Sequence, residues 1–219
     1  MVLAEGVVGE QQLGIGSPGA ARMDQQGGVV AANDHGWRFT GNYNNRLYTV
    51  ANQSVQALTL IGATTYTGLA LWNPPGSAVI ASVDECTVNV ATLPTAAAAI
   101  LLFEITSTPS AFTTAQVTYA AKVQPSIQGS SNASKCAGYT ALTLAAAPDA
   151  ATAPIIRALA SYLGVTTDAT SIQGVVTKAI EGSIILEPGT GVGIVAATTA
   201  ITVIGSFTWE ELPLSIYPG

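Results

Sequence analysis

Charge is scarce in this sequence. Lysine and arginine together number 7, aspartate and glutamate number 13, and charged residues make up 9% of the chain, against about 25% in a typical soluble domain. A free monomer usually keeps its surface charged for solubility. The shortage therefore favours a surface that is largely covered by other protein chains. A neutral monomer coated with threonine and serine is the alternative.

The few cations are also dispersed, and the net charge is −6. Neutralising the phosphates of a nucleic acid requires clustered lysine and arginine, and binding to an anionic membrane surface requires the same. The apolar run Thr95–Phe103 is too short to span a bilayer, and the start of the chain lacks the pattern of a signal peptide. We therefore expect neither nucleic acid nor membrane as a partner, and synthesis in the cytoplasm.

Histidine occurs once, at His35, inside a glycine-rich stretch. A Ser-His-Asp site needs a histidine supported on a rigid element. The acidic pairs Asp84/Glu85 and Glu210/Glu211 are sequence neighbours, which point to opposite faces of a strand, whereas glycosidase carboxylates face each other across a cleft. We interpret both pairs as solvated strand ends. The sequence thus predicts no enzyme activity, no cofactor and no metal.

Cysteine occurs twice, at Cys86 and Cys136. Two cysteines cannot define a disulfide scaffold at this length, and their spacing does not suit zinc. One bridge is possible, but two separate buried thiols are favoured. The glycosylation tripeptides that begin at Asn52 and Asn132 are interpreted as chance matches, because nothing else indicates a secretory route.

Residues 1–36 differ from the rest of the chain. The segment is rich in Gly, Ala and Gln, has no sustained period, and offers few apolar side chains to bury, among them Leu13, Ile15 and Met23. Alone it could not offset the entropy lost on ordering. We predict that residues 1–36 form an extended arm that docks on neighbouring subunits.

Strand signals begin at Trp37 and continue to the end, so residues 37–219 are predicted to form one domain. The clearest unit has a strand at Thr65–Trp72, a turn at Asn73–Ser77 and a second strand at Ala78–Val90. The two prolines of the turn remove donors and stop the strand ladder. Short strands separated by turn signals are typical of an all-β, antiparallel jelly-roll sandwich.

One short helix is expected within this domain, at Ala153–Gly164. Pro154 suits its first turn and Gly164 its C-terminal cap. Four apolar residues would share one face of the helix: Ile155, Ile156, Leu159 and Leu163.

The last part of the domain is predicted to return to strands. A strand at Gly182–Leu186 is followed by a Pro-Gly corner at Glu187–Gly189. Beyond it, Val192–Thr198 and Ala200–Trp209 are predicted as a pair of strands joined near Thr199. The stretch VGIVAATTAITVIG (Val192–Gly205) lacks polar alternation, which indicates a sheet that is buried on both faces because it packs against neighbouring subunits.

Two blocks of this pattern resemble bacteriophage structural proteins. They are TTYTGLALWNPPGSAVIASVDECTVNV (Thr64–Val90), which is similar to a hairpin of those proteins, and GSIILEPGTGVGIVAATTAITVIGSFTWEELP (Gly182–Pro213), which is similar to their closing half. The resemblance implies a jelly roll like the trimeric tumour-necrosis-factor-like domains. It brings no catalytic residues, and the arm and the helix lie outside its quoted blocks.

The function implied by the resemblance is assembly. We expect a homotrimeric capsid decoration (cement) protein in a virion, bound to the major capsid protein or other virion subunits. Trp209 is expected to be buried and to anchor the last strand. The residues expected to pack or assemble are Leu13, Ile15, Met23, Trp72, Ile194, Val203 and Trp209. The alternative is a tail or fibre module that binds a receptor or glycan through exposed aromatics such as Trp37, Trp72 or Tyr139.

Overall fold

The computed structural model describes residues 45–52, 54–63, 65–92, 94–106, 111–112, 121–125, 133–143, 155–162 and 175–214. The strands are β1 (Leu47–Asn52), β2 (Gln56–Ala57), β3 (Thr65–Asn73), β4 (Val79–Thr92), β5 (Ala98–Ile105), β6 (Ala111–Phe112), β7 (Ala121–Pro125), β8 (Ala137–Thr143), β9 (Ile155–Tyr162), β10 (Val175–Leu186), β11 (Thr190–Ala197) and β12 (Thr202–Pro213). The predicted arm, with Leu13, Ile15 and Met23, lies outside the described residues, as do His35 and Trp37.

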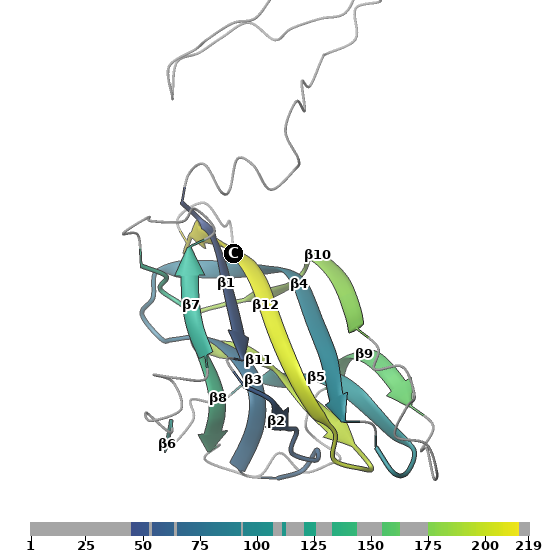
Figure 1. Ribbon diagram of the computed structural model, residues 1–219. Coiled ribbons are helices and arrows are strands. Elements are labelled where there is room, and N and C mark those ends of the chain that lie inside the picture. The colour runs from purple at the N-terminus through teal and green to yellow at the C-terminus, as the bar shows by residue number, and fades with distance from the viewer. Residues whose placement is uncertain are drawn as a thin grey trace, which may run out of the picture. The chain divides into compact units, whose positions relative to one another are not determined.

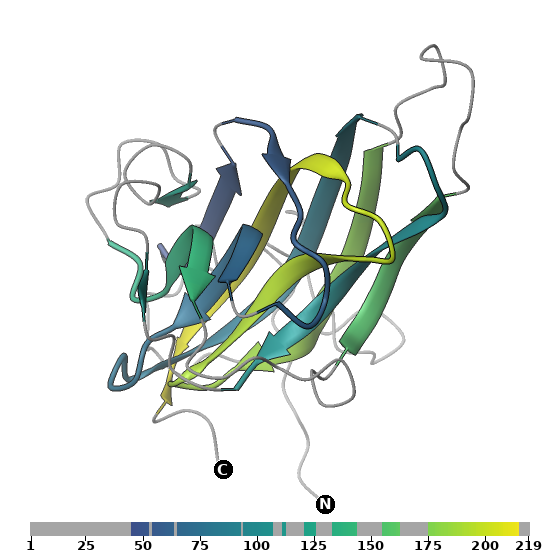
Figure 2. The ribbon, with the colours of Figure 1, turned by 90° about the horizontal axis from the view of Figure 1, so that it is seen from below.

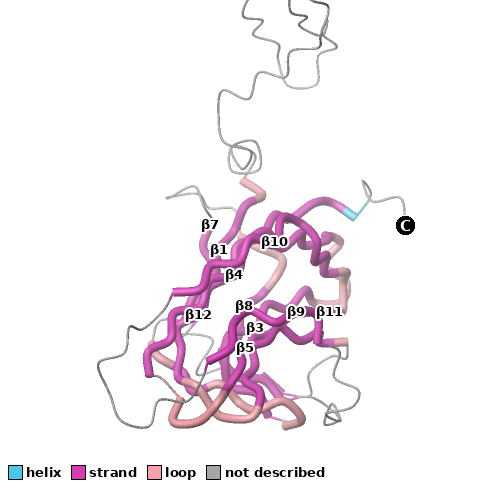
Figure 3. The backbone as a smooth tube through the Cα atoms, turned by 90° about the vertical axis from the view of Figure 1, so that its right-hand side faces the viewer, coloured by secondary structure: helices cyan, strands magenta, loops and turns pink. Residues whose placement is uncertain are grey.

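The strands form two sheets that face each other as a β-sandwich (Figures 1 and 3). Sheet I has the order β10-β4-β12-β1-β7, with β2 also paired to β12, and sheet II has the order β6-β8-β3-β11-β5-β9. All pairs of named strands are antiparallel. The predicted all-β, antiparallel sandwich is therefore confirmed.

The main core lies between the two sheets, which the view from below shows as two layers (Figure 2). β12 supplies Val203, Phe207 and Trp209, and all three side chains are fully buried. Their spacing places them on one face of the strand, while Ser206, Thr208 and Glu210 occupy the other. Within one chain β12 is therefore buried on its inner face, and burial of its outer face by a neighbouring subunit stays a prediction.

β11 is buried on both faces within one chain, because its six central residues are all buried. Val192 and Ile194 face the main core. Val195 faces outward into a second apolar cluster on the outer side of sheet II, where the rings of Tyr66 and Phe103 stack with centroids 4.5 Å apart. Sheet II is therefore packed on both sides along this strand, as a strand without polar alternation requires.

Two connections that the sequence suggests are hairpins run instead between the sheets. β3 belongs to sheet II and β4 to sheet I, although the predicted strand bounds agree with the structure within a few residues. Likewise β11 and β12 do not pair with each other, which corrects the predicted pair at Val192–Thr198 and Ala200–Trp209. At the second crossing Thr198 has a positive φ of 67°, and its hydroxyl donates to the carbonyl of Ala97 at 2.7 Å.

The helix predicted at Ala153–Gly164 is wrong, because Ile155–Tyr162 forms strand β9 at the edge of sheet II. β9 pairs antiparallel with β5 through two register shifts. Backbone pairing with an exposed neighbouring strand outweighs the weak helical preference of a short alanine-rich segment. The shifts also expose two successive isoleucines, Ile155 and Ile156.

Candidate functional site

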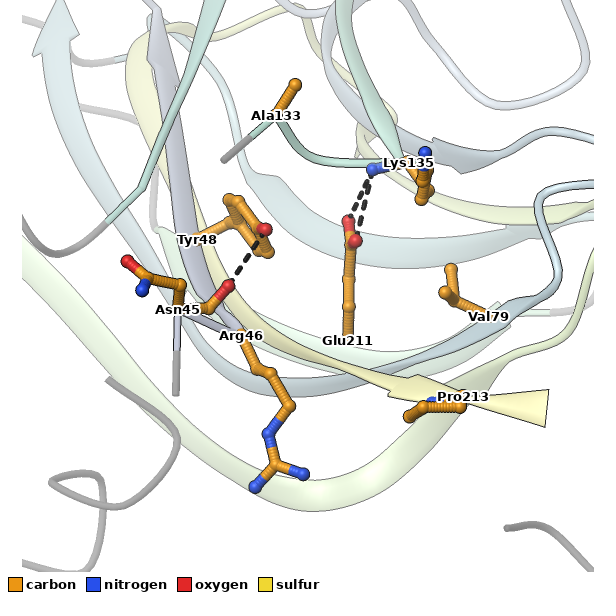
Figure 4. Close-up of a pocket in the computed structure, with 8 residues that line it drawn as sticks. All are labelled: Asn45, Arg46, Tyr48, Val79, Ala133, Lys135, Glu211 and Pro213. Atoms are coloured by element: carbon orange, nitrogen blue, oxygen red, sulfur yellow. Dashed lines mark hydrogen bonds between the residues drawn. The ribbon is translucent and has the colours of Figure 1, made fainter. Parts of the chain in front are cut away.

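The most concentrated polar cluster in the described residues surrounds the carboxylate of Glu211, near the end of β12. Glu211 is only 6% exposed. Its Oε1 accepts hydrogen bonds from the Ser134 hydroxyl, from the Cys136 backbone N–H at 3.1 Å and from Trp209 Nε1 at 3.3 Å. The Lys135 backbone N–H lies 3.1 and 3.0 Å from its two carboxylate oxygens (Figure 4).

This cluster ties the segment before β8 to the last strand of sheet I. Hydrogen bonds to an ionised acceptor are stronger than neutral ones, and here they satisfy donors that would otherwise be buried without partners. The interpretation of Glu211 as a solvated strand end is therefore wrong. Its neighbour Glu210 points to the other face of the strand and pairs with Arg46 at 3.1 Å.

Cys136 is free and buried beside the same carboxylate. Burial raises the pKa of its thiol, and the charge of Glu211 and its hydrogen bond with Cys136 raise it further. The nucleophilic form of cysteine is the thiolate, so this thiol is unreactive. Cys86 is likewise free and buried, which confirms two separate thiols.

A shallow depression of about 170 Å³ opens next to Glu211 (Figure 4). It is lined by Asn45, Arg46, Tyr48, Val79, Ala133, Lys135, Glu211 and Pro213. In the close-up the guanidinium of Arg46 extends away from Glu211 and Lys135. The depression is smaller than typical ligand pockets of about 300–1,000 Å³, and its charged groups do not converge on one point.

A second buried polar group, Asn73, holds the two Pro-Gly corners together. Its side-chain amide donates to the carbonyls of Val79 at 2.9 Å and Leu186 at 3.0 Å. Its backbone carbonyl accepts from the N–H of Gly189 at 2.7 Å. The turn after β3 and the corner after β10 are thereby joined, so both motifs of the sequence have a structural explanation.

The acidic pair Asp84/Glu85 does not form a site either. Asp84 lies where the register of β4 against both β10 and β12 shifts, and it is buried. Its interpretation as a solvated strand end is wrong, because the bulge turns it away from the outer face on which Glu85 lies. No group of three His, Cys, Asp or Glu side chains in the described part of the chain is placed to hold a metal ion.

The predicted packing residues that the structure describes are not gathered in one place. Ile194, Val203 and Trp209 lie in the main core, whereas Trp72 lies in the outer cluster of sheet II. Trp72 is 2% exposed, so it cannot serve as an aromatic platform for a ligand. Asn52 of the first glycosylation tripeptide is also buried, and its side-chain oxygen accepts from the Gly205 N–H at 3.0 Å.

The sequence matches no protein-family model, no curated protein and no solved structure. Similarity to known proteins therefore lends no support to the resemblance to phage structural proteins, which stays a prediction. Among the described residues, no helix is long and apolar enough to cross a membrane.

Proposed function

We propose that the chain is a non-enzymatic structural protein of a virion, a homotrimeric capsid decoration protein that binds the capsid shell and stabilises it. The observation that carries the proposal is the outer face of sheet I. In the middle of this face the strand register places small, mostly uncharged side chains in rows, which can pack against a neighbouring subunit.

The strand register defines two of these rows. One contains Thr177, Thr87, Ser206 and Ala51, and the next contains Ala179, Glu85, Thr208 and Thr49. We call these eight residues the hydroxyl face. Beyond its first row, Val175 and Ile204 lie on either side of Asn89, and both are exposed.

A face of this composition suits a protein partner better than permanent contact with water. The centres of protein interfaces are depleted of charged residues, and the hydroxyl face carries only Glu85. Its hydroxyl groups can form hydrogen bonds within the sheet, as between Thr87 and Thr177 at 3.3 Å, so burial leaves them satisfied. The low charge of the whole sequence supports the same conclusion.

Three finer features belong to this proposal. The sandwich is proposed to have jelly-roll connections, three copies are proposed to pack around the hydroxyl face, and residues 1–36 are proposed as the arm that docks on the shell. The partner of the arm is the major capsid protein or another virion subunit. The alternative receptor- or glycan-binding function loses one of its three aromatic candidates, because Trp72 is buried.

The trimer is tested by placing a charge in the centre of the hydroxyl face. We expect light scattering to give a mass for the purified protein that is a multiple of three chains. We expect Ser206→Arg to abolish the threefold association with unchanged circular dichroism. Thr65→Arg is the control, because Thr65 is exposed on the other sheet. A monomeric wild-type protein at micromolar concentration would contradict the trimer.

The virion role is tested separately, by mass spectrometry and a particle map of virions purified from cells that express the chain. We expect the sandwich at regular positions on the outside of the shell. A map that places it only in the tail would favour the receptor-binding alternative, and glycan-array binding by the isolated protein would do the same.

A further inference from the structure

We propose that two copies of the chain pair edge to edge along β9, about a two-fold axis that passes through Ala158. This contact is separate from the threefold contact through the hydroxyl face, and it does not depend on it. It joins sheet II of one copy to sheet II of another in one continuous antiparallel sheet.

β9 is the outermost strand of sheet II, and none of the described strands pairs with its far edge. A free edge presents unpaired backbone N–H and C=O groups, which natural proteins usually protect with charges or bulges. The edge strand of sheet I, β10, has such protection in Lys178, Glu181 and the positive-φ Gly182. β9 carries a single charge, Arg157, among apolar and small residues.

The side chains of β9 are also poorly covered. Ile155 is 41% exposed and its neighbour Ile156 is 37% exposed. Leaving isoleucine in water forfeits about 25 cal/mol for each Å² of apolar surface that could be buried. An apolar edge that no described strand pairs with, and whose isoleucines are exposed, is a site for association with another strand.

The pairing of β9 with β5 shows which of its residues share the outer face of sheet II. Ile155 pairs with Phe103, Ala158 with Leu101 and Ser161 with Ala99. Phe103 and Leu101 belong to the outer cluster. Ala99 precedes Leu101 by two residues, so it lies on the same face of β5. The two register shifts therefore place Ile155 and Ser161 symmetrically about Ala158, on one face.

This symmetry is what a two-fold pairing of identical strands requires, because residue i of one copy must contact residue j of the other and the reverse. With Ala158 opposite its own counterpart, Ile155 of each copy lies opposite Ser161 of the other. Paired residues then share a face of the continuous sheet, as cross-strand neighbours must.

Sheet II has a recess at the place where Ile155 of the other copy would pack. The register places three small side chains side by side, Ser161, Ala99 and Ala197. With Ala97, Ala98, Tyr162 and Thr198 they line an apolar recess of about 300 Å³. The two-fold axis thus places Ile155 of each copy beside the apolar recess of the other copy, so the same contact forms twice.

Charge agrees with this register. The only charged residue of the strand, Arg157, lies opposite Leu159 of the other copy, so no like charges face each other across the axis. Arg157 also stays engaged within its own copy, because its Nη2 donates to the Ser183 hydroxyl at 3.0 Å. An axis through Arg157 itself would oppose two guanidinium groups and is disfavoured. A second copy of the chain is therefore the occupant that the edge fits.

The axis is tested with one substitution, Ala158→Cys. Directly opposite residues of antiparallel strands have Cα atoms about 4.5–5.5 Å apart, within the range of a disulfide of about 4.4–6.8 Å. We expect mild oxidation of the full-length variant to give a disulfide-linked dimer on a non-reducing gel. Thr65→Cys is the control, because Thr65 is exposed on β3 and lies outside both proposed contacts, and it should give at least about tenfold less dimer. Wild-type protein corrects for Cys86 and Cys136.

The contact itself is tested with Ile155→Lys, measured by light scattering. Its control is Leu214→Lys, because Leu214 is 42% exposed and directly follows β12, away from β9 in the sequence. We expect Ile155→Lys to halve the mass of the assembly with unchanged melting temperature, from six copies to three if the trimer exists and from two copies to one if it does not. The two proposals therefore fail independently.

An unchanged mass for Ile155→Lys overturns the β9 contact, and so does equal cross-linking of Ala158→Cys and Thr65→Cys. Docking of residues 1–36 of a neighbouring copy on β9 would also overturn it. That segment contains no cysteine, so the Ala158→Cys variant would then form no symmetric dimer.

Discussion

Glu210 and Glu211 are adjacent in the sequence but lie in opposite environments, because successive residues of β12 point to opposite faces. Glu210 pairs with Arg46 at the surface, where an ion pair contributes little to stability, about 0–1 kcal/mol. Glu211 is buried and accepts hydrogen bonds from three donors before β8 and from the indole of Trp209. The free energy of unfolding should therefore respond very differently to changes at these two residues.

We predict that Glu211→Ala lowers the free energy of unfolding by about 2–5 kcal/mol, because buried donors lose their acceptor and each costs about 1–3 kcal/mol. Glu211→Gln keeps one oxygen acceptor and should cost less. Glu210→Ala is the control and should cost less than about 1 kcal/mol. Urea unfolding followed by tryptophan fluorescence measures all three, and equal losses at both positions would contradict the assignment.

From the buried thiol of Cys86 we predict that the free energy of unfolding falls at alkaline pH. Burial, and to a smaller extent the charge of Glu85, raise the pKa of its thiol from 9.0 to about 12. Between pH 9 and pH 12 the thiol therefore stays protonated in the folded state while it ionises in the unfolded chain. The contribution of this thiol to the free energy of unfolding is complete below pH 9 and is lost as the pH rises from 9 toward 12. The slope is at most about 1.4 kcal/mol per pH unit for one thiol.

Unfolding free energies measured between pH 8 and pH 11 check this expectation. Cys86→Ala should be less stable at neutral pH, and the difference from wild type should shrink as the pH rises. A constant difference over that range would mean that the thiol does not titrate differently in the two states.

Trp209 is fully buried and stacks on Tyr48 with ring centroids 6.0 Å apart. We predict that Trp209→Ala costs about 3–5 kcal/mol through the cavity it leaves. Trp209→Phe should cost less, because it keeps most of the apolar volume but loses the indole hydrogen bond to Glu211. An unchanged melting temperature for Trp209→Ala would refute its role as the anchor of the last strand.

Among the elements, β11 shows why glycines recur in a buried strand. A Cβ atom on Gly191 would lie 2.6 Å from the carbonyl oxygen of Leu71 and 2.8 Å from Cε3 of Trp72. The neighbouring strand β3 therefore approaches β11 more closely than any other residue would allow. The glycine-rich sequence after Pro188 serves packing, and it lies between two strands rather than between a strand and a helix.

We predict that Gly191→Ala destabilises the sandwich by about 1–3 kcal/mol, because the backbone of β3 must move. Thr190→Ala is the control. It removes an exposed hydrogen bond from the Thr190 hydroxyl to the Glu187 carbonyl, which is expected to cost less than about 1 kcal/mol. Thermal melts compare the two variants, and an unchanged melting temperature for Gly191→Ala would show that the strands can separate freely.

An element can be predicted from the sequence when residues close to it in the chain determine its structure. The strands on either side of Pro74 and Pro75 are predicted within a few residues, because residue type and the two prolines fix them locally. β9 is misread because Pro154, Gly164 and the spacing of its isoleucines also fit a helix, and only the pairing with β5 decides. Which sheet β11 and β12 join depends on partners far away in the sequence.

The polar cluster around Glu211 could not be predicted for the same reason. Its donor Ser134 is separated from it by 77 residues, and no pattern near either residue indicates the other. Asp84 is a second case, since its burial comes from a bulge that depends on both neighbouring strands. By contrast the burial of Trp209 follows from its own residue type and from the alternation of β12.

At the scale of the whole molecule, the described strands of both sheets lie between Leu47 and Pro213. We predict that deletion of residues 1–36 leaves the sandwich folded, with a melting temperature within a few degrees of wild type. If the arm docks on the capsid shell, incorporation into particles should fall sharply. Circular dichroism and particle composition measure the two effects, and unfolding of the truncated protein would place the segment in the core.

The position of β12 has a consequence for the making of the protein. β12 is the last of the described strands, yet it lies in the middle of sheet I, between β4 and β1. The ribosome must therefore synthesise every other described strand before that sheet can close, and at about 5–20 residues per second the stretch from β4 to β12 takes on the order of ten seconds. During that time the edges of β4 and β1 that β12 later covers are open to other chains, so we expect chaperones to protect the nascent chain.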